Sequence, residues 1–278
     1  MHIRFRQPCP ELQSHVQSIM IVHEHLDPLS EHTSFRPFPP AAEQCMYLYP
    51  REKSWVKSRP GKPSLQQPFC LLVGPQVSRV ELGIVGEHIM IGFMFKPGGL
   101  HRLIGIPMTH LFDQALDGSL VWPVAIRQLE EQMTATGDGL AMVAYAEDFL
   151  KKQYVKSAVS SLPIDAVLKT MLHIASPYSV DQLATMACLS TRQFDRKFYE
   201  RIGMSPKQFM RIARFSAAFR LKERSPAVDW LTIALQCGYY DFQHMLRDFK
   251  EFAGTTPSLF LASEAITNSE TTSLFSAR

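Results

Sequence analysis

The chain has 278 residues, of which 46% are hydrophobic and 20% are charged, a composition typical of folded domains and a length that suits two of them. It lacks a run of about 18 apolar residues, which argues against a membrane span, and its first residues lack the apolar segment of a secretory signal. Five scattered cysteines without C-x-x-C spacing predict neither a zinc site nor a disulfide framework, so we expect a cytoplasmic protein.

The net charge of +3 is unevenly distributed along the chain. Residues 163–262 contain thirteen Lys and Arg against nine Asp and Glu, whereas the rest of the chain is close to neutral. A basic region beside a neutral one hints at a polyanion such as nucleic acid as the partner of the C-terminal third.

Residues 1–122 contain short runs of apolar, β-branched and aromatic residues bounded by Pro and Gly: SIMIVHEHL, QCMYLYP, FCLLVGPQ and HIMIGFMFKPGG. Short strands at such spacing predict an antiparallel sandwich or barrel. Several aromatic and Met positions in these runs either line a ligand pocket or pack in the core, and core packing is the interpretation we favour: Met46, Tyr47, Tyr49, Phe93 and Phe95.

Two histidines, His23 and His25, would share one face of a strand, as a metal site requires. Glu31 and His88 or His101 are nominal further ligands, but their spacing does not match a cupin metal site. The alternative is a pair of half-exposed polar residues on an outer face. We expect no metal and no cofactor.

The glycine-rich stretch from Phe95 to Gly105 lacks the spacing of a nucleotide-binding loop. We interpret it as a turn into a helix, with an anion site at the helix start as the alternative.

The pattern changes at Pro123, where PVAIRQLEEQM and LAMVAYAEDFLKKQY show apolar residues at spacings of three and four. This spacing predicts two amphipathic helices in a helical linker over 123–160. From Pro163 onward nearly every stretch has the pattern of a short helix, and Pro163 suits a first helical turn. The polar residues 263–278 predict a loose C-terminal tail.

The C-terminal stretch GYYDFQHMLRDFKEFAGTTP repeats, 51 residues later, the spacing of STRQFDRKFYERIGMSPKQF. Arg, Phe, Gly and Pro recur at equivalent places, in the pairs Arg196 and Arg247, Phe198 and Phe249, Gly203 and Gly254, Pro206 and Pro257, and Phe209 and Phe260. The same offset places Ala187 on Gly238. The repeat predicts two copies of one structural unit.

Each copy has the pattern of a helix, a tight turn and a second helix. The first helix carries small apolar residues, which let two helices cross closely: Leu183, Ala184 and Ala187 in one copy, Ile233, Ala234 and Gly238 in the other. Ser190 or Asp241 is expected to cap the second helix. Gly203 or Gly254 is expected to end it.

The second helix of each copy is predicted to have an apolar side and a polar side. The apolar side holds Phe194 and Phe198 in one copy and Met245 and Phe249 in the other. The pattern is that of a helix-turn-helix, whose second helix enters the major groove of DNA. Two structural helical hairpins with solvated faces are the alternative.

The segment IALQCGYYDFQHMLRDFKEFAGTTP resembles the signature of the AraC/XylS family of bacterial transcription factors, and LSTRQFDRKFYERIGMSPKQFMRIARF resembles the family's first motif. The resemblance covers about Pro163 to Leu261. It implies two helix-turn-helix units joined by a long helix over about Pro206–Glu223.

Carried over by position, the resemblance implies the DNA-binding residues of both copies: Ser190, Thr191, Arg192, Gln193, Asp195, Arg196, Asp241, Phe242, Gln243, His244, Leu246, Arg247 and Lys250. Asp195 has the wrong charge for a phosphate contact; it accepts from a cytosine amino group or orients Arg192. Phe242 and Leu246 are apolar where polar residues are usual, so the second helix contacts thymine methyl groups or mostly holds the DNA backbone.

The stretch GFMFKPGGLHRLIGIPMTHLFDQALDGSLVW resembles the cupin-like domains of some relatives, which sense small molecules or mediate dimerisation. The expected fold is thus α+β, with a β-rich cupin-like domain over 1–122, the linker over 123–160 and a tandem helix-turn-helix domain over 161–262. The expected protein is a non-enzymatic transcription regulator.

Double-stranded DNA is the expected partner, and RNA polymerase, a small-molecule effector and a second copy of the chain are candidates. The helices of residues 124–153 are the expected dimer surface. The alternatives are a cupin-type metal-dependent enzyme and a DNA-repair alkyl acceptor, which requires a reactive cysteine among Cys9, Cys45, Cys70, Cys188 and Cys237. Small packed residues are the favoured interpretation of Cys188 and Cys237.

Overall fold

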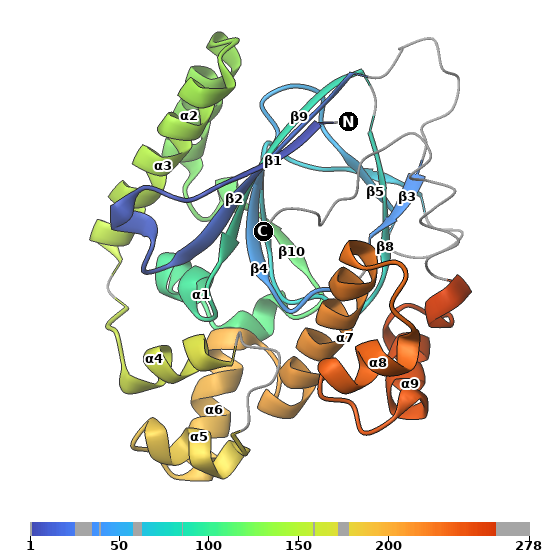
Figure 1. Ribbon diagram of the computed structural model, residues 1–278. Helices are drawn as coiled ribbons and strands as arrows, with labels where there is room; N and C mark the ends of the chain where they lie inside the picture. The colour runs from blue at the N-terminus through green and yellow to red at the C-terminus, as the bar shows by residue number, and fades with distance from the viewer. Residues whose placement is uncertain are drawn as a thin grey trace.

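The structure is a computed structural model that describes residues 2–25, 35–38, 40–57, 63–84, 86–157, 159–171 and 178–259. The C-terminal tail and Glu31 lie outside the described residues. Strands make up most of the N-terminal part and helices all of the C-terminal part (Figure 1). The expected α+β class is confirmed.

The larger sheet has six antiparallel strands in the order β1-β2-β9-β4-β7-β10. Their bounds are β1 His2–Arg6, β2 Val16–His25, β9 Glu87–Phe95, β4 Gln44–Leu48, β7 Cys70–Val73 and β10 Ala115–Asp117. The smaller sheet has the order β3-β8-β5-β6, with β3 Phe35–Phe38, β8 Val80–Gly83, β5 Trp55–Lys57 and β6 Leu65–Gln66. The two sheets face each other as a sandwich and do not close into one barrel.

Both faces of the larger sheet are buried. In β4, Cys45 and Tyr47 point between the two sheets, whereas Met46 and Leu48 point to the opposite face and are fully buried there. Successive side chains of a strand point to opposite faces. A strand that is covered on both sides therefore shows a continuous apolar run, which is the pattern of these segments.

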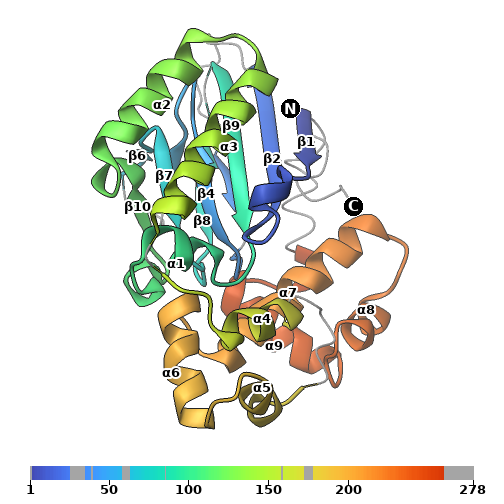
Figure 2. The ribbon, with the colours of Figure 1, turned by 90° about the vertical axis from the view of Figure 1, so that its left-hand side faces the viewer.

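Helices cover the outer face of the larger sheet (Figure 2). Their bounds are α1 Gly99–Ile104, α2 Pro123–Ala135 and α3 Gly139–Lys156, with short 3-10 turns η1 Pro10–Leu12, η2 Met108–Leu111 and η3 Gly118–Leu120. The two helices predicted over 123–160 are confirmed, and their apolar sides share one core with the sheet. The chain enters α3 through Asp138, whose carboxylate accepts from the Leu140 amide at 2.9 Å and caps the helix.

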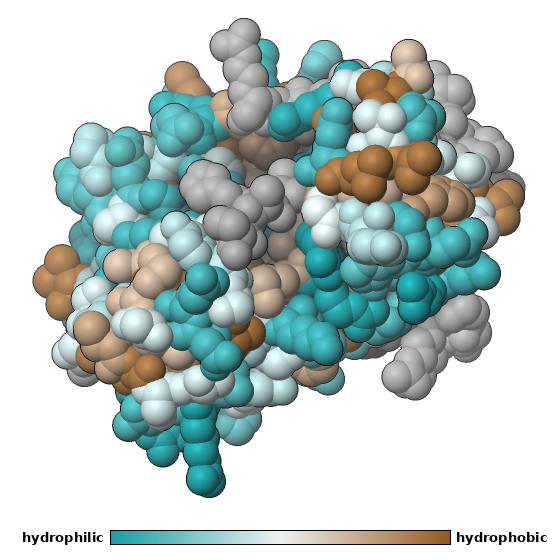
Figure 3. Space-filling view, turned by 60° about the horizontal axis from the view of Figure 1, so that its bottom comes forward, coloured by the Kyte–Doolittle hydropathy of each residue, from teal (hydrophilic) through white to brown (hydrophobic). Residues whose placement is uncertain are grey.

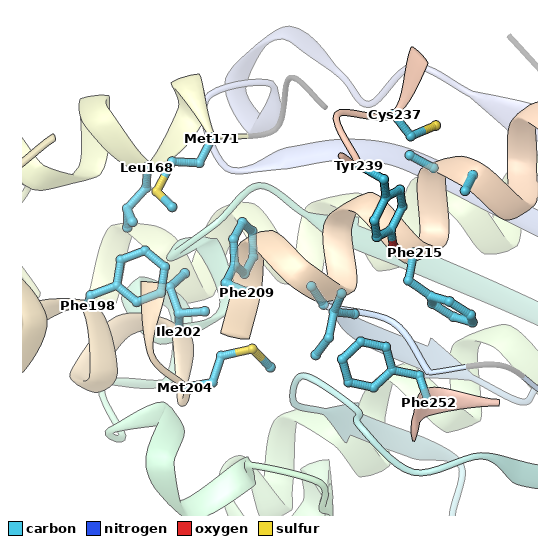
Figure 4. Packing of buried hydrophobic residues seen from close by; sticks show 14 of the residues in the cluster. Leu168, Met171, Phe198, Ile202, Met204, Phe209, Phe215, Cys237, Tyr239 and Phe252 are labelled. Atoms are coloured by element: carbon cyan, nitrogen blue, oxygen red, sulfur yellow. The ribbon is translucent and has the colours of Figure 1, made fainter. Parts of the chain in front are cut away.

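The C-terminal part consists of six described helices: α4 Pro163–Thr170, α5 Val180–Met186, α6 Thr191–Ile202, α7 Pro206–Arg224, α8 Trp230–Gln236 and α9 Phe242–Phe252. The long helix α7 confirms the predicted connection. Phe209, near its start, packs against Phe198 with ring centroids 5.7 Å apart, and Phe215 packs against Phe249 at 4.8 Å. Side chains near the start and in the middle of α7 thus belong to one hydrophobic core (Figure 4).

The two parts of the chain touch along the start of β4. Ala42 is buried within the C-terminal core, and the side-chain amide of Gln44 donates to the carbonyl oxygen of Arg201 at 2.8 Å. Gly203 also approaches η2, since a Cβ at this glycine would lie 2.6 Å from the Met108 carbonyl oxygen. The C-terminal end of α6 is therefore docked on the N-terminal part.

Within the described residues, none of the helices combines the length and hydrophobicity needed to cross a lipid bilayer.

Candidate nucleic-acid interface

Helices α5 and α6 form one helix-turn-helix unit, and α8 and α9 form a second. Leu183 and Ala184 in α5 and Ile233 and Ala234 in α8 are buried. The small side chains of Ala184 and Ala234 suit the close helix crossing that the repeat predicted. In each turn one residue adopts a left-handed conformation: Cys188 at φ 56° in the first unit and a glycine, Gly238, at φ 78° in the second.

The structure corrects the register of the repeat before each turn. The Leu189 amide donates to the Ala184 carbonyl oxygen, and the Tyr239 amide donates to the Ala234 carbonyl oxygen. These equivalent bonds are 50 residues apart, so Cys188, rather than Ala187, corresponds to Gly238. The offset of 51 holds only from the caps onward because the second turn has one additional residue, the exposed Tyr240.

Both second helices begin at the expected caps. The Ser190 side chain accepts from the Gln193 amide at 3.3 Å, and the Gln193 side-chain oxygen accepts from the Ser190 amide at 3.0 Å, a reciprocal capping box. The Asp241 carboxylate accepts from the His244 amide at 2.6 Å. The Gln193 carboxamide oxygen is thus used inside the protein.

The outer face of α6 is polar and exposed. Arg192, Gln193 and Arg196 are exposed, as is Thr191, whose hydroxyl donates to the Asp181 carboxylate at 2.7 Å. Asp195 is half-buried. Two cationic side chains therefore stand one turn apart near the start of this helix.

The outer face of α9 has fewer exposed groups. Gln243, Arg247 and Lys250 are exposed, whereas Phe242, His244 and Leu246 are half-buried. Phe242 packs against the C-terminal core, and the His244 ring meets the ring of Tyr239 edge-on at 5.1 Å. The polar contacts that this helix offers are therefore concentrated at Gln243, Arg247 and Lys250. Seen from the side of the C-terminal helices, the surface is largely hydrophilic with smaller hydrophobic patches between (Figure 3).

The opposite faces of both helices are buried. Phe194, Phe198, Met245 and Phe249 are inaccessible to solvent, as the repeat predicted. Fixing these side chains in the core orients the polar faces outward. A solvated face alone does not explain why two capped helices present an exposed arginine at the equivalent positions Arg196 and Arg247, so the arrangement favours binding over plain hairpins.

Two ion pairs between different helices hold α6 and α9 in place on their buried sides. Arg201, at the end of α6, donates to the Asp165 carboxylate of α4 at 2.8 Å. Arg211, in α7, donates to the buried carboxylate of Asp248, in α9, at 2.7 Å. These residues could not be predicted from the sequence, because the members of each pair are more than 30 positions apart and no local spacing connects them.

A cavity of about 190 Å³ lies between the two sheets of the N-terminal part. Tyr47 and Tyr49 line it, whereas Met46, Phe93 and Phe95 pack in the core on the other face of the larger sheet. Core packing thus holds for Met46, Phe93 and Phe95, whereas Tyr47 and Tyr49 face a cavity. The alternation along the strand separates the two groups.

The residues considered for metal binding do not come together. His88 and His101 are buried and pair with the carbonyl oxygens of Glu52 and Ile106 at 2.9 and 3.0 Å, and His23 lies 3.6 Å from Glu87. Over the described ranges, no group of three or more His, Cys, Asp or Glu side chains has the geometry of a metal site.

The cysteine thiols are mostly buried. Burial raises the pKa of Cys45 to about 12 and that of Cys237 to about 11, and it also raises the pKa of Cys9 and Cys70. A raised pKa disfavours the thiolate that alkyl transfer requires. Cys188 is exposed in the first turn rather than packed, contrary to expectation, and Cys237 is packed as expected.

Comparison with known proteins defines the class of the C-terminal part. Residues 183–263 match the family model described as a helix-turn-helix domain, and residues 4–117 match one described as a domain of unknown function. The C-terminal part is therefore a helix-turn-helix domain.

Two curated relatives match this region. An uncharacterized HTH-type transcriptional regulator of Haemophilus influenzae is 34% identical over 102 residues, which cover 36% of this chain and 34% of the relative. The HTH-type transcriptional regulator ArgR of Pseudomonas aeruginosa is 30% identical over 93 residues, covering 33% of this chain and 28% of the relative. The matched region thus spans about a third of the length of these relatives.

Among solved structures, ToxT from Vibrio cholerae is similar over 88% of this chain and 98% of its own, with a TM-score of 0.47 and 11% identity. The DNA-binding domain of AdpA, solved in complex with a target DNA, is similar over 40% of this chain and 99% of its own, with a TM-score of 0.37 and 28% identity.

Proposed function

We propose that this protein is a sequence-specific, effector-responsive transcription regulator of bacterial type that binds DNA in the cytoplasm. One observation carries the proposal: two capped helices, α6 and α9, expose polar faces while their opposite faces are buried in a core organised by one long helix, α7. Each helix would enter the major groove, in segments about 34 Å apart along the duplex.

The exposed side chains suit distinct roles. Arg192 and Arg247 would contact guanine edges or phosphates, and Gln243 would pair with adenine, since these pairings follow from the donors and acceptors of the major groove. Gln193, whose carboxamide oxygen is held in the capping box, would donate its amide group to an acceptor on a base edge. Arg196 and Lys250 would neutralise phosphates. Ser190 and Asp241 would act by capping, as they do in the free protein.

The remaining predicted residues would have minor roles. Thr191 and His244 would contact the DNA backbone, and Asp195 would accept from a cytosine amino group. Phe242 and Leu246 would make apolar contacts with thymine methyl groups or hold the helix in place.

Regulation would come from the N-terminal part. A ligand in the cavity between the sheets would alter DNA binding only if it binds two states of the chain with different affinity. We assign residues 1–122 to this sensor, 123–160 to a helical connection whose helices would also form the interface of a homodimer, and 161–262 to DNA binding. RNA polymerase would be the downstream partner.

The test is duplex binding by the full chain, followed by fluorescence anisotropy on a site selected from a random duplex pool. The logarithm of affinity should fall with the logarithm of salt concentration with a slope of about −0.9 per phosphate contact. Arg196→Ala should weaken binding to every sequence and reduce the slope by about one, whereas Arg192→Ala should relax the preference at one base pair.

Arg4→Ala is the matched control, because Arg4 is an exposed arginine of β1, outside the helix-turn-helix units and outside the helices assigned to the dimer interface. It should leave affinity unchanged. Indifference of the wild-type chain to any duplex at low salt contradicts the proposal. An unaltered base preference in Arg192→Ala contradicts the role of that residue.

The enzyme alternatives, a cupin-type metal enzyme and an alkyl acceptor, have no specific observation in their favour on the described part of the chain.

A further inference from the structure

The cavity between the two sheets has one charged residue among the described residues that line it, Glu43. The surface around it is otherwise apolar or neutral, with Met20, Val22, Leu71 and Leu82 among the lining side chains. The size of about 190 Å³ exceeds the roughly 150 Å³ of an apolar cavity that binds benzene, so a small ring fits.

The other ionisable groups that line the cavity are neutral near pH 7. Burial raises the pKa of Cys45 to about 12 and keeps the pKa of Tyr47 well above its usual value. Burial raises the pKa of Tyr49 to about 12 and lowers that of His88. The charge that a ligand meets inside is therefore the carboxylate of Glu43.

Glu43 is also incompletely paired. Its Oε1 accepts from the Arg220 guanidinium on α7 at 3.2 Å, whereas its Oε2 is inaccessible to solvent and has no hydrogen-bond partner among the described residues. A buried acceptor without a partner costs free energy, which a donor from a ligand would recover. An anion in the cavity would instead be desolvated and repelled by this carboxylate.

Glu43 stands between two spaces. Besides the cavity, it lines a smaller cleft of about 70 Å³ between the N-terminal sheet and the C-terminal helices, together with Arg220, Phe209 and Ile202. The Glu43 carboxylate thus lies between the cavity and the long helix α7, which connects the two helix-turn-helix units.

We propose that the cavity binds a small apolar molecule bearing a cationic amino group, which pairs with Glu43 and thereby weakens the ion pair between Glu43 and Arg220. This ligand class deepens the effector-responsive function proposed above and rests on it for its biological meaning. The ammonium and the guanidinium share one negative charge, so each lowers the affinity of the carboxylate for the other, a reciprocal coupling typically of 5- to 150-fold.

The test is isothermal titration calorimetry of the full chain without DNA. The probes are 2-phenylethylamine, its neutral analogue 2-phenylethanol and the anion 3-phenylpropionate. We expect the amine to bind at least tenfold more tightly than the anion. Glu43→Gln should weaken the amine at least tenfold and change the affinity of the alcohol less than threefold.

Glu81→Gln is the matched control, since Glu81 lies on β8 between two cavity-lining residues, Val80 and Leu82, but does not line the cavity itself. It should leave amine binding within twofold of wild type. Amine and anion binding equally well, or Glu43→Gln binding the amine as wild type does, overturns the ligand class.

Arg220→Gln tests the coupling separately. Removing the competing cation should tighten amine binding at least fivefold, and unchanged or weaker binding overturns the coupling. Circular dichroism at matched concentration verifies that each variant is folded. These measurements contain no DNA, so they test the cavity separately from the proposed regulator. A chain that binds the amine but no duplex refutes the regulator and leaves the cavity assignment intact. A chain that binds duplex DNA but not the amine refutes the cavity assignment and leaves the regulator intact.

Discussion

The guanidinium of Arg211 in α7 holds the carboxylate of Asp248 in α9 through two hydrogen bonds, from Nε at 3.1 Å and from Nη2 at 2.7 Å. Asp248 is 1% exposed, so this pair connects α9 to the long helix α7 in the protein interior. Arg211 also binds the exposed Glu251, one turn further along α9.

Arg211→Met should destabilise the protein by about 3 kcal/mol, because it leaves the buried charge of Asp248 without a partner. Glu251→Gln should cost less than about 1 kcal/mol, since that partner is exposed. Urea denaturation followed by circular dichroism measures both free energies of unfolding. Equal losses of unfolding free energy in the two variants would contradict a stabilising role of the buried Arg211–Asp248 pair.

Gly203 and Gly254 occupy equivalent places at the ends of α6 and α9, and their backbone φ angles are 92° and 71°. Alanine at either position is strained by about 1 kcal/mol because left-handed backbone disfavours a Cβ. A Cβ at Gly203 would also lie 2.6 Å from the Met108 carbonyl oxygen, whereas one at Gly254 would meet no atom of the described residues within 4 Å. Gly203→Ala should therefore lower the free energy of unfolding by about 1–2 kcal/mol more than Gly254→Ala. Equal effects in thermal unfolding argue against close docking of α6 on η2.

Asp241→Ala should destabilise the second unit by about 1 kcal/mol, since it removes the acceptor of the His244 amide. Asp241→Asn keeps an acceptor oxygen and should stay within about 0.5 kcal/mol of wild type. Denaturant titration of the three proteins distinguishes the loss of the cap from the loss of the charge. A larger loss in the Asn variant than in the Ala variant refutes the capping role.

His15 stacks on Tyr154 with ring centroids 4.1 Å apart, and burial lowers its pKa to about 4. A histidine whose folded pKa lies below its unfolded value of 6.5 contributes stability at higher pH and loses it as the pH falls from about 6.5 toward about 4. One such group should cost about 2 kcal/mol between pH 7 and pH 5.

His15→Phe retains an aromatic ring against Tyr154 and removes the titration. The fall in unfolding free energy between pH 7 and pH 5 should therefore be smaller by about 2 kcal/mol in this variant than in wild type. Parallel pH profiles for the two proteins refute this role of His15.

Local spacing explains how much of the DNA-binding region could be predicted. The caps Ser190 and Asp241, the buried aromatic residues and the terminal glycines recur at one offset, because each is required by a helix end or a packed face. The offset before the turns was wrong by one residue because a single exposed insertion, Tyr240, leaves no trace in the polar pattern around it.

Contacts between distant segments could not be predicted. Glu43 and Arg220 are 177 positions apart, and no periodicity joins a strand start to the middle of a helix. The faces of the sheet to which Tyr47 and Met46 point could not be predicted either. Both faces of the larger sheet are buried, so the sequence of its strands does not alternate between polar and apolar residues. Fold class follows from local patterns, whereas the cavity and its link to the helices follow only from tertiary structure.

The rod-like helix α7 has a geometric consequence for the DNA sites that such a chain can occupy. Each residue of an α-helix advances by about 1.5 Å and turns by about 100°. Phe209 packs against Phe198 of α6 and Phe215 against Phe249 of α9, so a one-residue deletion between them would rotate α9 by about 100° relative to α6. In the proposed function, the separation of the two DNA half-sites would thus be set by the length of a single helix, independently of which bases are contacted.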